Sequence, residues 1–550
     1  MKNKNNFALI ILNLIIFFIL CYALLQNGIW RGHDWLAHFQ RLISLNEELD
    51  AQQFPPLFNY WLPGQFGYSW QLFYPPLTSF LFLLARIITF NSTDNILQMK
   101  IVLFIIFVIA FICAFYAGKR EHNSSAAGYL CTILFITSGY FLTNIFIRFA
   151  LGEMLAMAFM PLFLRGCSSL LGDRRDIWLI PFSALAIALS NMPSLIVTAI
   201  FFLLFFIINI KRLINRINIR FFLESLICFM ALSAFYWIPL LYHMRHSDIF
   251  ATHAKLLSYE DVFRFSSGIM ENLFSLPSKY GVSNHGMYLS VGVIQLLIAI
   301  GYLRYGRSAP AKKVILVALF FILAATHLLP WYLLPDRFSF LKIMQFPWRL
   351  LSCATAIVAL FTSGMLAGIW QRRPLAILLM AALCIASMFF PMNQALTERH
   401  TRLEHMGLWD DYLNNSNIRE DNFAHLYNND FAYFANKNAS ITTTGYTDGY
   451  PDMIITVRGE QTVTLPYIMY AGYYLLVDDK KTDVSRLDNG LVGVKLTAGE
   501  HRVSLLYERN IVVVPMMVSI ISFFIISFII IFRHRRVIRI RMFSQRFLPF

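Results

Sequence analysis

Charged residues are scarce in this chain: only 14% of its 550 residues are Asp, Glu, Lys or Arg, whereas 57% are apolar. A soluble domain carries roughly 25% charged residues, because its surface must be solvated. The composition therefore excludes a soluble globular protein. Apolar runs of about 18 to 20 residues, enough to cross a roughly 30 Å hydrocarbon core as a helix, recur along most of the chain. The sequence predicts a polytopic helical membrane protein.

Cysteine is also sparse, and its seven copies form no recognisable framework. They are Cys21, Cys113, Cys131, Cys167, Cys228, Cys353 and Cys384, all inside or at the edge of apolar segments and none in a Cys-x-x-Cys pair. A disulfide framework and a zinc site are therefore not predicted. The sequence also lacks a P-loop, a dinucleotide-binding glycine motif and a nucleophile elbow, so no nucleotide cofactor is expected.

Acidic residues are outnumbered, since 46 Lys and Arg stand against 31 Asp and Glu, for a net charge of +15. In a soluble chain this balance would suggest a nucleic-acid partner. Here the basic residues stand mainly at the ends of apolar runs, where they act as topology signals. We expect membrane lipids as the surroundings of the chain and no nucleic acid as a partner.

The apolar runs predict about twelve transmembrane helices. They are residues 7–26, 99–117, 126–145, 150–166, 176–192, 194–210, 221–240, 288–304, 313–330, 350–369, 374–391 and 511–532. A further apolar segment, residues 74–90, begins next to Pro75 and Pro76 and contains Arg86. If it does not cross, about half of all Lys and Arg gather in short loops on the side of the N-terminus, as the positive-inside rule requires. We therefore predict a re-entrant or interfacial helix on the outer side, with both termini in the cytoplasm.

This topology divides the chain into three parts. Residues 1–392 form a transmembrane domain whose first outer loop is 27–98, residues 393–510 form an extracytoplasmic insert, and residues 511–550 form the last transmembrane helix with a basic cytoplasmic tail. The second half of the insert alternates apolar and polar residues at 453–457, 462–467, 473–477, 491–496 and 501–507. Alternation between turn signals is typical of strands and predicts a small β-sandwich.

The first outer loop departs most from the apolar composition. It reads Arg31-Gly-His-Asp-Trp-Leu-Ala-His-Phe-Gln-Arg41, directly after the first span. If residues 34–49 are helical, Asp34, His38 and Arg41 share one face at positions i, i+4 and i+7. Two alternatives stay open: a surface helix with solvated polar residues, or half of a metal site for which no third ligand is evident.

Further ionisable residues lie at the predicted outer ends of spans. Arg148 and Glu153 flank the start of the fourth span, and Arg349 opens the tenth. Ionisable groups at such depth are costly unless they are paired or functional. Arg148 and Glu153 therefore form either a ligand site or a structural ion pair. Arg349 either binds a phosphate or snorkels to the interface. Four histidines between residues 241 and 287 lack metal-ligand spacing and are expected to be solvated: His243, His246, His253 and His285.

The order of several short motifs resembles bacterial membrane proteins related to 6-pyruvoyl-tetrahydropterin synthase, which are similar to YfhO-type members of the GT-C glycosyltransferase superfamily. The motifs are Gly32-His33-Asp34 with His38 and Arg41, Phe54-Pro-Pro56, Gly67-Tyr68, Phe73-Tyr-Pro-Pro76, Arg148 with Glu153, and Phe346-Pro-Trp-Arg349. In the insert, Leu465-Pro-Tyr, Ala471-Gly-Tyr-Tyr and Ala498-Gly-Glu-His501 resemble the C-terminal domain of YfhO-type proteins. The resemblance covers nearly the whole chain.

The resemblance implies a GT-C-like fold, an extracytoplasmic active site, a polyprenyl-phosphate sugar as donor and an acid in the first outer loop as catalytic base. Asp34 matches that acid. We assign leaving-phosphate stabilisation to Arg148 and Arg349. Contacts to sugar or acceptor are assigned to His33, His38 and Tyr74, and Arg41 and Glu153 are further candidate substrate-binding residues. This chain has His33-Asp34 where many superfamily members carry two acids, so a second acid and a divalent metal stay open.

The expected function is that of an inverting glycosyltransferase in the bacterial cytoplasmic membrane. Its acceptor would be a cell-envelope glycan, lipid or polymer. One alternative is a flippase or transporter of lipid-linked glycans. Another is a non-catalytic glycan-assembly or glycan-binding membrane protein, because a fold alone does not define an activity.

Overall fold

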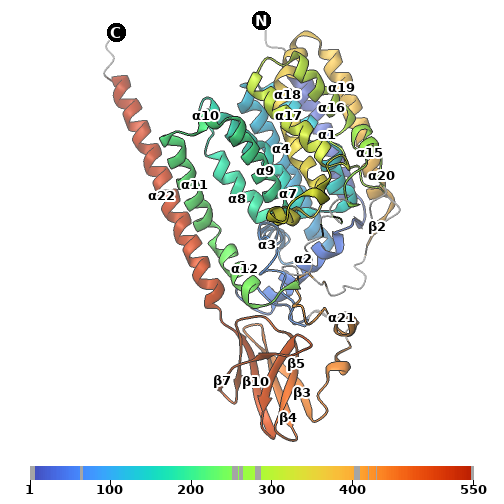
Figure 1. The fold of residues 1–550 in the computed structure, drawn as a ribbon, viewed down its shortest axis with the longest axis vertical. Helices are drawn as coiled ribbons and strands as arrows, with labels where there is room; N and C mark the ends of the chain where they lie inside the picture. Colours follow the sequence, from blue (N-terminus) through green and yellow to red (C-terminus); the bar gives the residue numbers. More distant parts are fainter. Residues whose placement is uncertain are drawn as a thin grey trace.

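The computed structural model describes residues 6–61, 66–250, 258, 260, 264–278, 286–401, 409, 411–418, 420–428 and 430–546. A bundle of apolar helices makes up most of the molecule, and a β-domain projects from one end of it (Figure 1). Helix α1 begins and helix α22 ends at the opposite end. The predicted fold class is confirmed, because the β-domain is inserted directly before the last long helix.

Every predicted span overlaps a helix. The helices are α1 (Phe7–Leu25), α2 (Trp35–Asp50), α3 (Leu77–Ile88), α4 (Asn95–His122), α5 (Ser125–Ile136), α6 (Gly139–Thr143), the π-helix η1 (Asn144–Arg148), α7 (Leu151–Leu171), α8 (Leu179–Ser190), α9 (Met192–Ile208), α10 (Ile210–Leu213), α11 (Arg216–Leu232), α12 (Ala234–His246), α15 (Ile269–Phe274), α16 (Val293–Tyr305), α17 (Ala309–Ala324), η2 (Trp331–Leu333), η3 (Asp336–Met344), η4 (Pro347–Arg349), α18 (Leu350–Arg372), α19 (Pro374–Ser387), α20 (Phe389–Thr397), α21 (Glu420–Tyr427), η5 (Phe431–Phe434) and α22 (Asn510–Arg546).

Helix length supports fewer crossings than the sequence predicts. Among the described residues, six helices are long and apolar enough to span a membrane. The number rises to eight if two bent pairs, α5 with α6–η1 (52°) and α11 with α12 (71°), each form one span. The other four predicted spans correspond to α8, α9, α16 and α17, which have 12 to 17 residues. A straight crossing needs about 20 residues, so the total of twelve stays a prediction.

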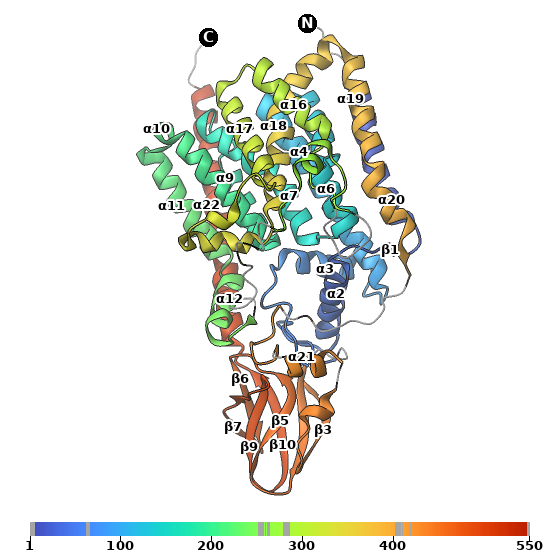
Figure 2. The same ribbon diagram turned by 45° about the vertical axis from the view of Figure 1, so that its right-hand side comes forward.

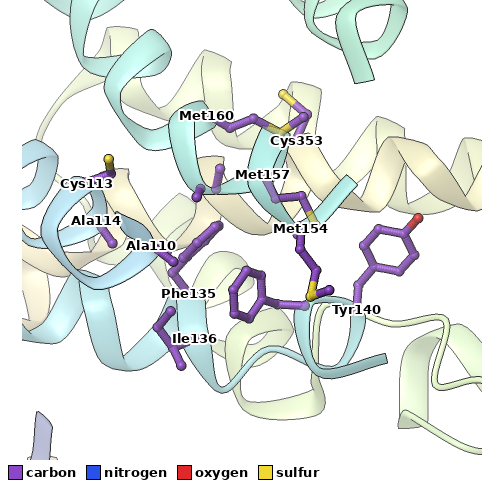
Figure 3. Close-up of a cluster of buried hydrophobic side chains, with 14 of the residues drawn as sticks. Ala110, Cys113, Ala114, Phe135, Ile136, Tyr140, Met154, Met157, Met160 and Cys353 are labelled. Atoms are coloured by element: carbon purple, nitrogen blue, oxygen red, sulfur yellow. The ribbon is translucent and has the colours of Figure 1, made fainter. Parts of the chain in front are cut away.

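Helices α7 and α18 form the centre of the bundle. In an apolar stretch of 18 residues, 89% of the residues are buried in α18 and 83% in α7, against 17% in α22. Figure 3 shows methionines of α7 packed among small and apolar side chains of α4, α5 and α18. Where α4 meets α5, a Cβ on Gly118 would come within 2.5 Å of the Cβ of Cys131. Small residues let the two backbones approach closely, which drives helix packing in lipid.

The apolar segment 74–90 contains one short helix, α3. With 12 residues it is too short to cross a bilayer. It packs against α2, α4, α7 and α8 at the end of the bundle nearest the β-domain. These contacts bury one face of α3, whereas large apolar side chains of its other face are exposed. Its depth in the membrane stays a prediction.

The β-domain consists of two antiparallel sheets. The larger sheet has the order β3 (Ala439–Thr447), β4 (Tyr450–Val457), β10 (Gly499–Tyr507), β6 (Tyr473–Val477), β7 (Lys480–Thr482), and the smaller one has the order β5 (Gln461–Ile468), β9 (Leu491–Leu496), β8 (Ser485–Arg486). Inward side chains of both sheets, such as Ile455 and Val494, share one hydrophobic cluster. All five predicted strands are confirmed. Strands β3, β7 and β8 were not predicted.

The β-domain is joined to the first outer loop by a cluster of aromatic rings, here called the aromatic junction. It comprises Phe58, Tyr60, Phe73, Tyr412, Tyr450, Tyr470, Tyr473 and Tyr507. The ring of Phe58 lies 4.9 Å from that of Tyr473 and 5.0 Å from that of Tyr507. Gln53, just after α2, donates to the carbonyl of Gly449 at 2.9 Å. Figure 2 shows α2 and α3 between the helical bundle and the β-domain.

Two more contacts bind the insert to the bundle. Strand β1 (Ile29–Trp30) pairs with β2 (Arg399–His400), so the start of the insert is paired with the start of the first outer loop. Helix α22 packs along α11 and α12, and the hydroxyl of Ser519 accepts a hydrogen bond from the N–H of Phe235 at 3.0 Å. The insert is therefore held at both of its ends as well as at the aromatic junction.

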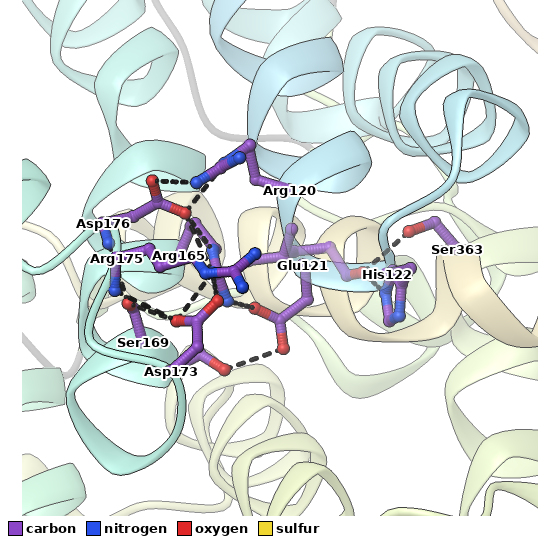
Figure 4. A network of polar contacts seen from close by, with 11 residues as sticks. Arg120, Glu121, His122, Arg165, Ser169, Asp173, Arg175, Asp176 and Ser363 are labelled. Carbon is purple, nitrogen blue, oxygen red and sulfur yellow. Dashed lines mark hydrogen bonds and ion pairs between the residues drawn. The ribbon is translucent and has the colours of Figure 1, made fainter. Parts of the chain in front are cut away.

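At the opposite end of the bundle, an ion network connects α4, α7 and α8. Arg165 of α7 contacts Glu121, Asp173 and Asp176 at 2.8 to 3.1 Å, and Arg120 forms two bonds to Asp176 (Figure 4). A buried arginine surrounded by carboxylates is compensated, so the network fixes the turn between α7 and α8.

Candidate functional site

Close backbone contact places Asp34 beside Arg148. The N–H of His33 donates to the carbonyl of Ile147 at 3.1 Å, and the N–H of Asp34 donates to the carbonyl of Arg148 at 2.8 Å. A Cβ at Gly32 would lie 2.5 Å from the Cβ of Phe149, closer than real Cβ contacts. Only glycine permits this approach. The Gly-His-Asp sequence therefore holds Asp34 against the interruption of the helix that precedes α7.

That break has an unusual backbone. Helix α6 continues into the π-helix η1, and Phe149 then adopts a left-handed conformation with φ of 58°. The N–H of Ala150 returns to the carbonyl of Asn144 at 2.9 Å before α7 begins. Such conformations cost free energy and are concentrated at functional sites. The turn brings Arg148 and Glu153 together across their five-residue spacing.

Glu153 is the centre of a buried ion cluster. Its Oε2 lies 2.6 Å from Nη1 of Arg148 and 3.3 Å from Nε of Arg349, and its Oε1 accepts a hydrogen bond from the hydroxyl of Tyr140 at 2.5 Å. Arg148 also donates to Oδ1 of Asn144 at 2.6 Å. The carboxylate of Glu153 is 1% exposed. A buried charge must be paired and hydrogen-bonded, and this carboxylate has three partners.

Asp34 has different surroundings. Its side chain is 46% exposed, and its Oδ2 is 3.7 Å from Nη2 of Arg148. This separation fits a loose ion pair rather than a hydrogen bond. Of the two acids in the cluster, Asp34 is the one that solvent reaches.

Arg41 is a buried cation next to this cluster. Its Nη2 donates to the hydroxyls of Thr78 at 2.7 Å and Ser79 at 3.3 Å, and its guanidinium stacks 3.5 Å above the ring centre of Tyr74. No carboxylate of a described residue forms an ion pair with it, and its Nε has no hydrogen-bond partner. Burial lowers the pKa of Arg41. A guanidinium nevertheless stays charged, so Arg41 contributes an uncompensated positive charge.

His38 connects Arg41 to the start of α7. Its Nε2 is 3.2 Å from the N–H of Leu151, and its Nδ1 is 3.3 Å from Nη1 of Arg41. Burial, with the charges of Arg41 and Arg148, holds the pKa of His38 well below its ordinary value. The imidazole is therefore neutral and accepts a hydrogen bond from the otherwise unpaired first turn of the helix. Burial also lowers the pKa of His33, although the charge of Asp34 partly opposes the shift.

The structure brings the eight predicted site residues into one neighbourhood and decides two of the alternatives. The surface-helix interpretation of α2 is wrong, because His38 and Arg41 are buried. Arg349 does not snorkel, since its guanidinium is buried against Glu153. Among the described residues, no group of three or more His, Cys, Asp or Glu side chains is placed to hold a metal ion.

Several contributors to this neighbourhood were not predicted. Tyr140 and Asn144 lie in an apolar span, and only their polarity distinguishes them there. Thr78 and Ser79 belong to the segment 74–90, in which only Tyr74 was predicted as a site residue. His243 was expected to be solvated, but it is buried at the aromatic junction, 2.8 Å from the hydroxyl of Tyr507. Two other histidines of that prediction, His253 and His285, lie outside the described residues.

Known proteins resemble this chain at several levels. An uncharacterized protein of Lactococcus lactis subsp. cremoris (strain MG1363) is 28% identical over 251 residues, which are 44% of this chain and 41% of that protein. The solved arabinofuranosyltransferase AftD from Mycobacteria is similar with a TM-score of 0.43 and 15% identity, over 74% of this chain and 28% of AftD. The Archaeoglobus fulgidus oligosaccharyltransferase in its apo form is similar with a TM-score of 0.43 and 12% identity, over 78% of this chain and 60% of that one.

The sequence profile of one family matches residues 72–395, which include α3, the break at η1, and both Glu153 and Arg349. The family is described as "6-pyruvoyl-tetrahydropterin synthase related domain; membrane protein". The match covers more than half of the chain. This protein therefore belongs to the 6-pyruvoyl-tetrahydropterin synthase related family of membrane proteins.

Proposed function

We propose that this protein is an inverting glycosyltransferase that moves a sugar from a polyprenyl-phosphate donor to a cell-envelope acceptor, on the outer side of the bacterial cytoplasmic membrane. One observation carries the proposal: a single accessible carboxylate, Asp34, lies at the edge of a buried cluster rich in guanidinium groups. Family membership agrees with a membrane location, and the order of the sequence motifs supports the choice of donor.

The charges of the cluster favour an anion. Three guanidinium groups, Arg41, Arg148 and Arg349, stand against the carboxylates of Asp34 and Glu153, and His38 is neutral. One positive charge is therefore left over. The first turn of α7 points into the same neighbourhood, and helix N-termini favour negative charge. A lipid-linked phosphate would supply the missing charge.

Helix α3 suits the lipid part of such a donor. Thr78 and Ser79 at its start bind Arg41, whereas its other face exposes large apolar side chains. These are Phe80, Leu83, Leu84, Ile87 and Ile88. A molecule with a phosphate at one end and a polyprenyl chain behind it matches this division between polar and apolar faces.

The reaction would be a direct displacement. Asp34 takes the proton of the acceptor hydroxyl while that oxygen forms a bond to the anomeric carbon. The bond from this carbon to the phosphate oxygen breaks, and its electron pair leaves with the lipid phosphate. The guanidinium groups of Arg148 and Arg349 stabilise the departing charge.

Glu153 would be a positioning residue in this scheme. Both of its oxygens are engaged, so it orients Arg148 and Arg349 instead of reacting. A double displacement needs a second carboxylate that reaches the sugar as nucleophile. Within the described cluster Asp34 alone is accessible, which favours a single step with inversion at the anomeric carbon.

The test uses the purified full-length protein with synthetic polyprenyl-phosphate hexoses and membranes that supply the acceptor. Asp34→Asn should lower the transfer rate at least about 100-fold, the usual contribution of a general base. The matched control is Asp50→Asn, at an exposed acid of the same helix, which should transfer normally. An Asp34→Asn variant that is folded and transfers at the wild-type rate would exclude Asp34 as the base.

The proposed sidedness has its own test. A cysteine placed at Gly459, in the open turn between β4 and β5, should react with a membrane-impermeant maleimide added to intact cells. A cysteine at Arg307, between α16 and α17, should react only after the membrane is opened. The reverse pattern would overturn the topology.

A flippase for lipid-linked glycans is the second candidate, because two bent helix pairs are present and transporters use broken helices around their substrate. Proteoliposomes that contain the polyprenyl-phosphate hexose distinguish the two. Movement of the lipid across the bilayer, without transfer and without an effect of Asp34→Asn, would favour the flippase.

A further inference from the structure

The larger sheet of the β-domain has one covered and one open face. Residues that point inward, such as Met453, Val503 and Leu505, are buried against the smaller sheet. Their neighbours in sequence point to the other side. Asp452, Ser504 and Leu476 are only half-buried, and Arg502 is exposed. This open face belongs to no part of the site described above.

The strand register arranges the outward residues in a row. Asp452 of β4 is paired with Ser504 of β10, Ser504 with Leu476 of β6, and Leu476 with Lys481 of β7. Directly paired residues have side chains on the same face of a sheet. Two positions further along these strands, Arg502 of β10 is paired with Ile454 of β4. Both residues lie on the same face as the row, because side chains alternate along a strand.

This face is hollowed. A depression of about 380 Å³ is centred on the row. The outward residues Asp452, Leu476, Arg502 and Ser504 line it, together with Thr444 and Asp479. Its volume suits a few sugar units rather than a single ion.

Polar groups of the depression are arranged in advance. The carboxylate of Asp452 accepts hydrogen bonds from the hydroxyls of Ser504 at 2.5 Å and Thr447 at 2.7 Å, which fix its orientation. Asp479 sits in the turn between β6 and β7 with φ of 64°. The guanidinium of Arg502 is exposed and forms no ion pair with a described carboxylate. Carboxylate oxygens in fixed positions and a guanidinium with several N–H donors suit a ligand that is rich in hydroxyl groups.

The open face also has an aromatic edge. Tyr474 lies two residues before Leu476 on β6 and therefore points to the same side. The ammonium of Lys481 lies 4.3 Å from its ring centre, which holds the ring in place. A tyrosine combines an apolar ring surface with a polar hydroxyl. Such a ring packs against the C–H face of a sugar.

We propose that this open face binds the glycan chain of the acceptor through neutral sugar units. Asp452 and Asp479 face Arg502, and Lys481 is paired with Glu508 at 3.5 Å, so the face has no excess positive charge to select an anionic polymer or lipid surface. The depression lies across the sheet and not along an edge strand, so pairing with a peptide strand is not favoured. The proposal rests on the proposed function for its acceptor, but binding is measured without transfer.

Direct contacts connect the β-domain to the candidate active site. The aromatic junction and Gln53 join the β-domain to the loop that follows α2, and Asp34 directly precedes α2. A glycan held on the open face therefore keeps a fixed position relative to the catalytic base. The face would supply affinity for the acceptor, whereas Asp34 would supply chemistry.

The experiment measures retention of the full-length protein in detergent by gels that contain a defined neutral polysaccharide. The panel is dextran, mannan, galactan and β-glucan. The wild-type protein should be retarded by at least one of them, and Arg502→Ala and Tyr474→Ala should each weaken that retention about tenfold. Lys495→Ala removes an exposed cation from the smaller sheet and should behave as the wild type.

Other outcomes overturn the proposal. No retention by any polysaccharide would do so, and so would equal retention of all variants with unchanged thermal unfolding. Binding to vesicles of anionic phospholipid in place of the polysaccharides would assign the face to lipid. Asp34→Asn should lose transfer and keep retention, so a failure of the proposed chemistry is distinguishable from a failure of the binding face.

Discussion

At the scale of single residues, Asp34 and Glu153 show how surroundings divide the roles of two like groups. Both carboxylates contact Arg148, but Asp34 is reached by solvent and Glu153 is enclosed by two guanidinium groups and a tyrosine hydroxyl. An enclosed carboxylate with three partners is held in its ionised form and in one orientation. The accessible acid is free to change partners and to accept a proton.

Removal of the enclosed charge should destabilise the protein strongly. Glu153→Gln would leave two buried guanidinium groups with one charge fewer to compensate them, at a cost of about 3–5 kcal/mol. Thermal unfolding in detergent measures the loss. Glu224→Gln removes the acid of an exposed pair with Arg220 and should cost less than about 0.5 kcal/mol. Similar losses for both variants would contradict a structural role of the buried cluster.

Residue types and spacing predicted part of this site. The helical spacing of Asp34, His38 and Arg41 indicated one shared face, and the cost of charge in lipid singled out Arg148, Glu153 and Arg349. These residues meet because the helix is interrupted at η1, and no residue pattern predicts that interruption. Tyr140 was not predicted as a site residue, because an aromatic residue in an apolar span usually packs against its neighbours.

At the scale of elements, the break between α6 and α7 sets the position of Asp34. Gly32 is the residue whose missing side chain allows the contact with Phe149. Gly32→Ala should push the loop away from the break and lower transfer more than about tenfold, since a displacement of about 1 Å at a reacting group has effects of this size.

Gly32→Ala should change substrate affinity and thermal stability less than it changes the transfer rate. The control for a glycine replacement is Gly301→Ala in α16, where a Cβ meets nothing within 4 Å and the activity should be unchanged. Wild-type transfer by Gly32→Ala would mean that the loop tolerates the displacement and that the contact with Phe149 does not position the acid.

Helix α2 carries a buried acid, Glu48, that should make the stability of the protein depend on pH. Glu48 accepts a hydrogen bond from Ser44 at 2.7 Å, and burial raises its pKa from 4.5 to about 8. Its neutral form contributes full stability below pH 4.5, where the unfolded chain is also protonated, and this contribution is lost as the pH rises to 8. Glu48→Gln cannot ionise, so it should match the wild type near pH 4.5 and unfold a few degrees higher near pH 8.

Thermal unfolding in detergent between pH 4.5 and 8.5 measures this difference. A constant difference across that range would show that Glu48 does not titrate with the stated shift. The sequence analysis considered a helix over residues 34–49, and α2 spans Trp35–Asp50. The burial of both of its faces was not predictable, since it depends on α3 and the β-domain.

At the scale of the whole molecule, the aromatic junction determines whether the β-domain and the bundle act as one body. Phe58→Ala removes a fully buried ring that contacts five tyrosines, at a cost of about 3–5 kcal/mol. Limited proteolysis should then cut the chain near the junction faster than in the wild type. Phe90→Ala, at a ring that is 93% exposed, should leave the cleavage rate unchanged.

Equal cleavage of both phenylalanine variants would show that the junction contributes little to the docking of the domain. The long apolar helices and five of the eight strands of the β-domain were predicted from hydropathy and alternation alone. The junction was not, because its members are spread from residue 58 to residue 507 and only the fold brings them together.

The pairing of β1 with β2 has a consequence for the integrity of the particle. The insert enters through a strand bound to the first outer loop and leaves through a helix that is packed into the bundle. A single peptide-bond cleavage between β2 and the β-domain would therefore produce two polypeptides that stay together as one noncovalent complex. Such a nicked molecule would elute from a sizing column as the intact one does, and the two pieces would separate only under denaturing conditions.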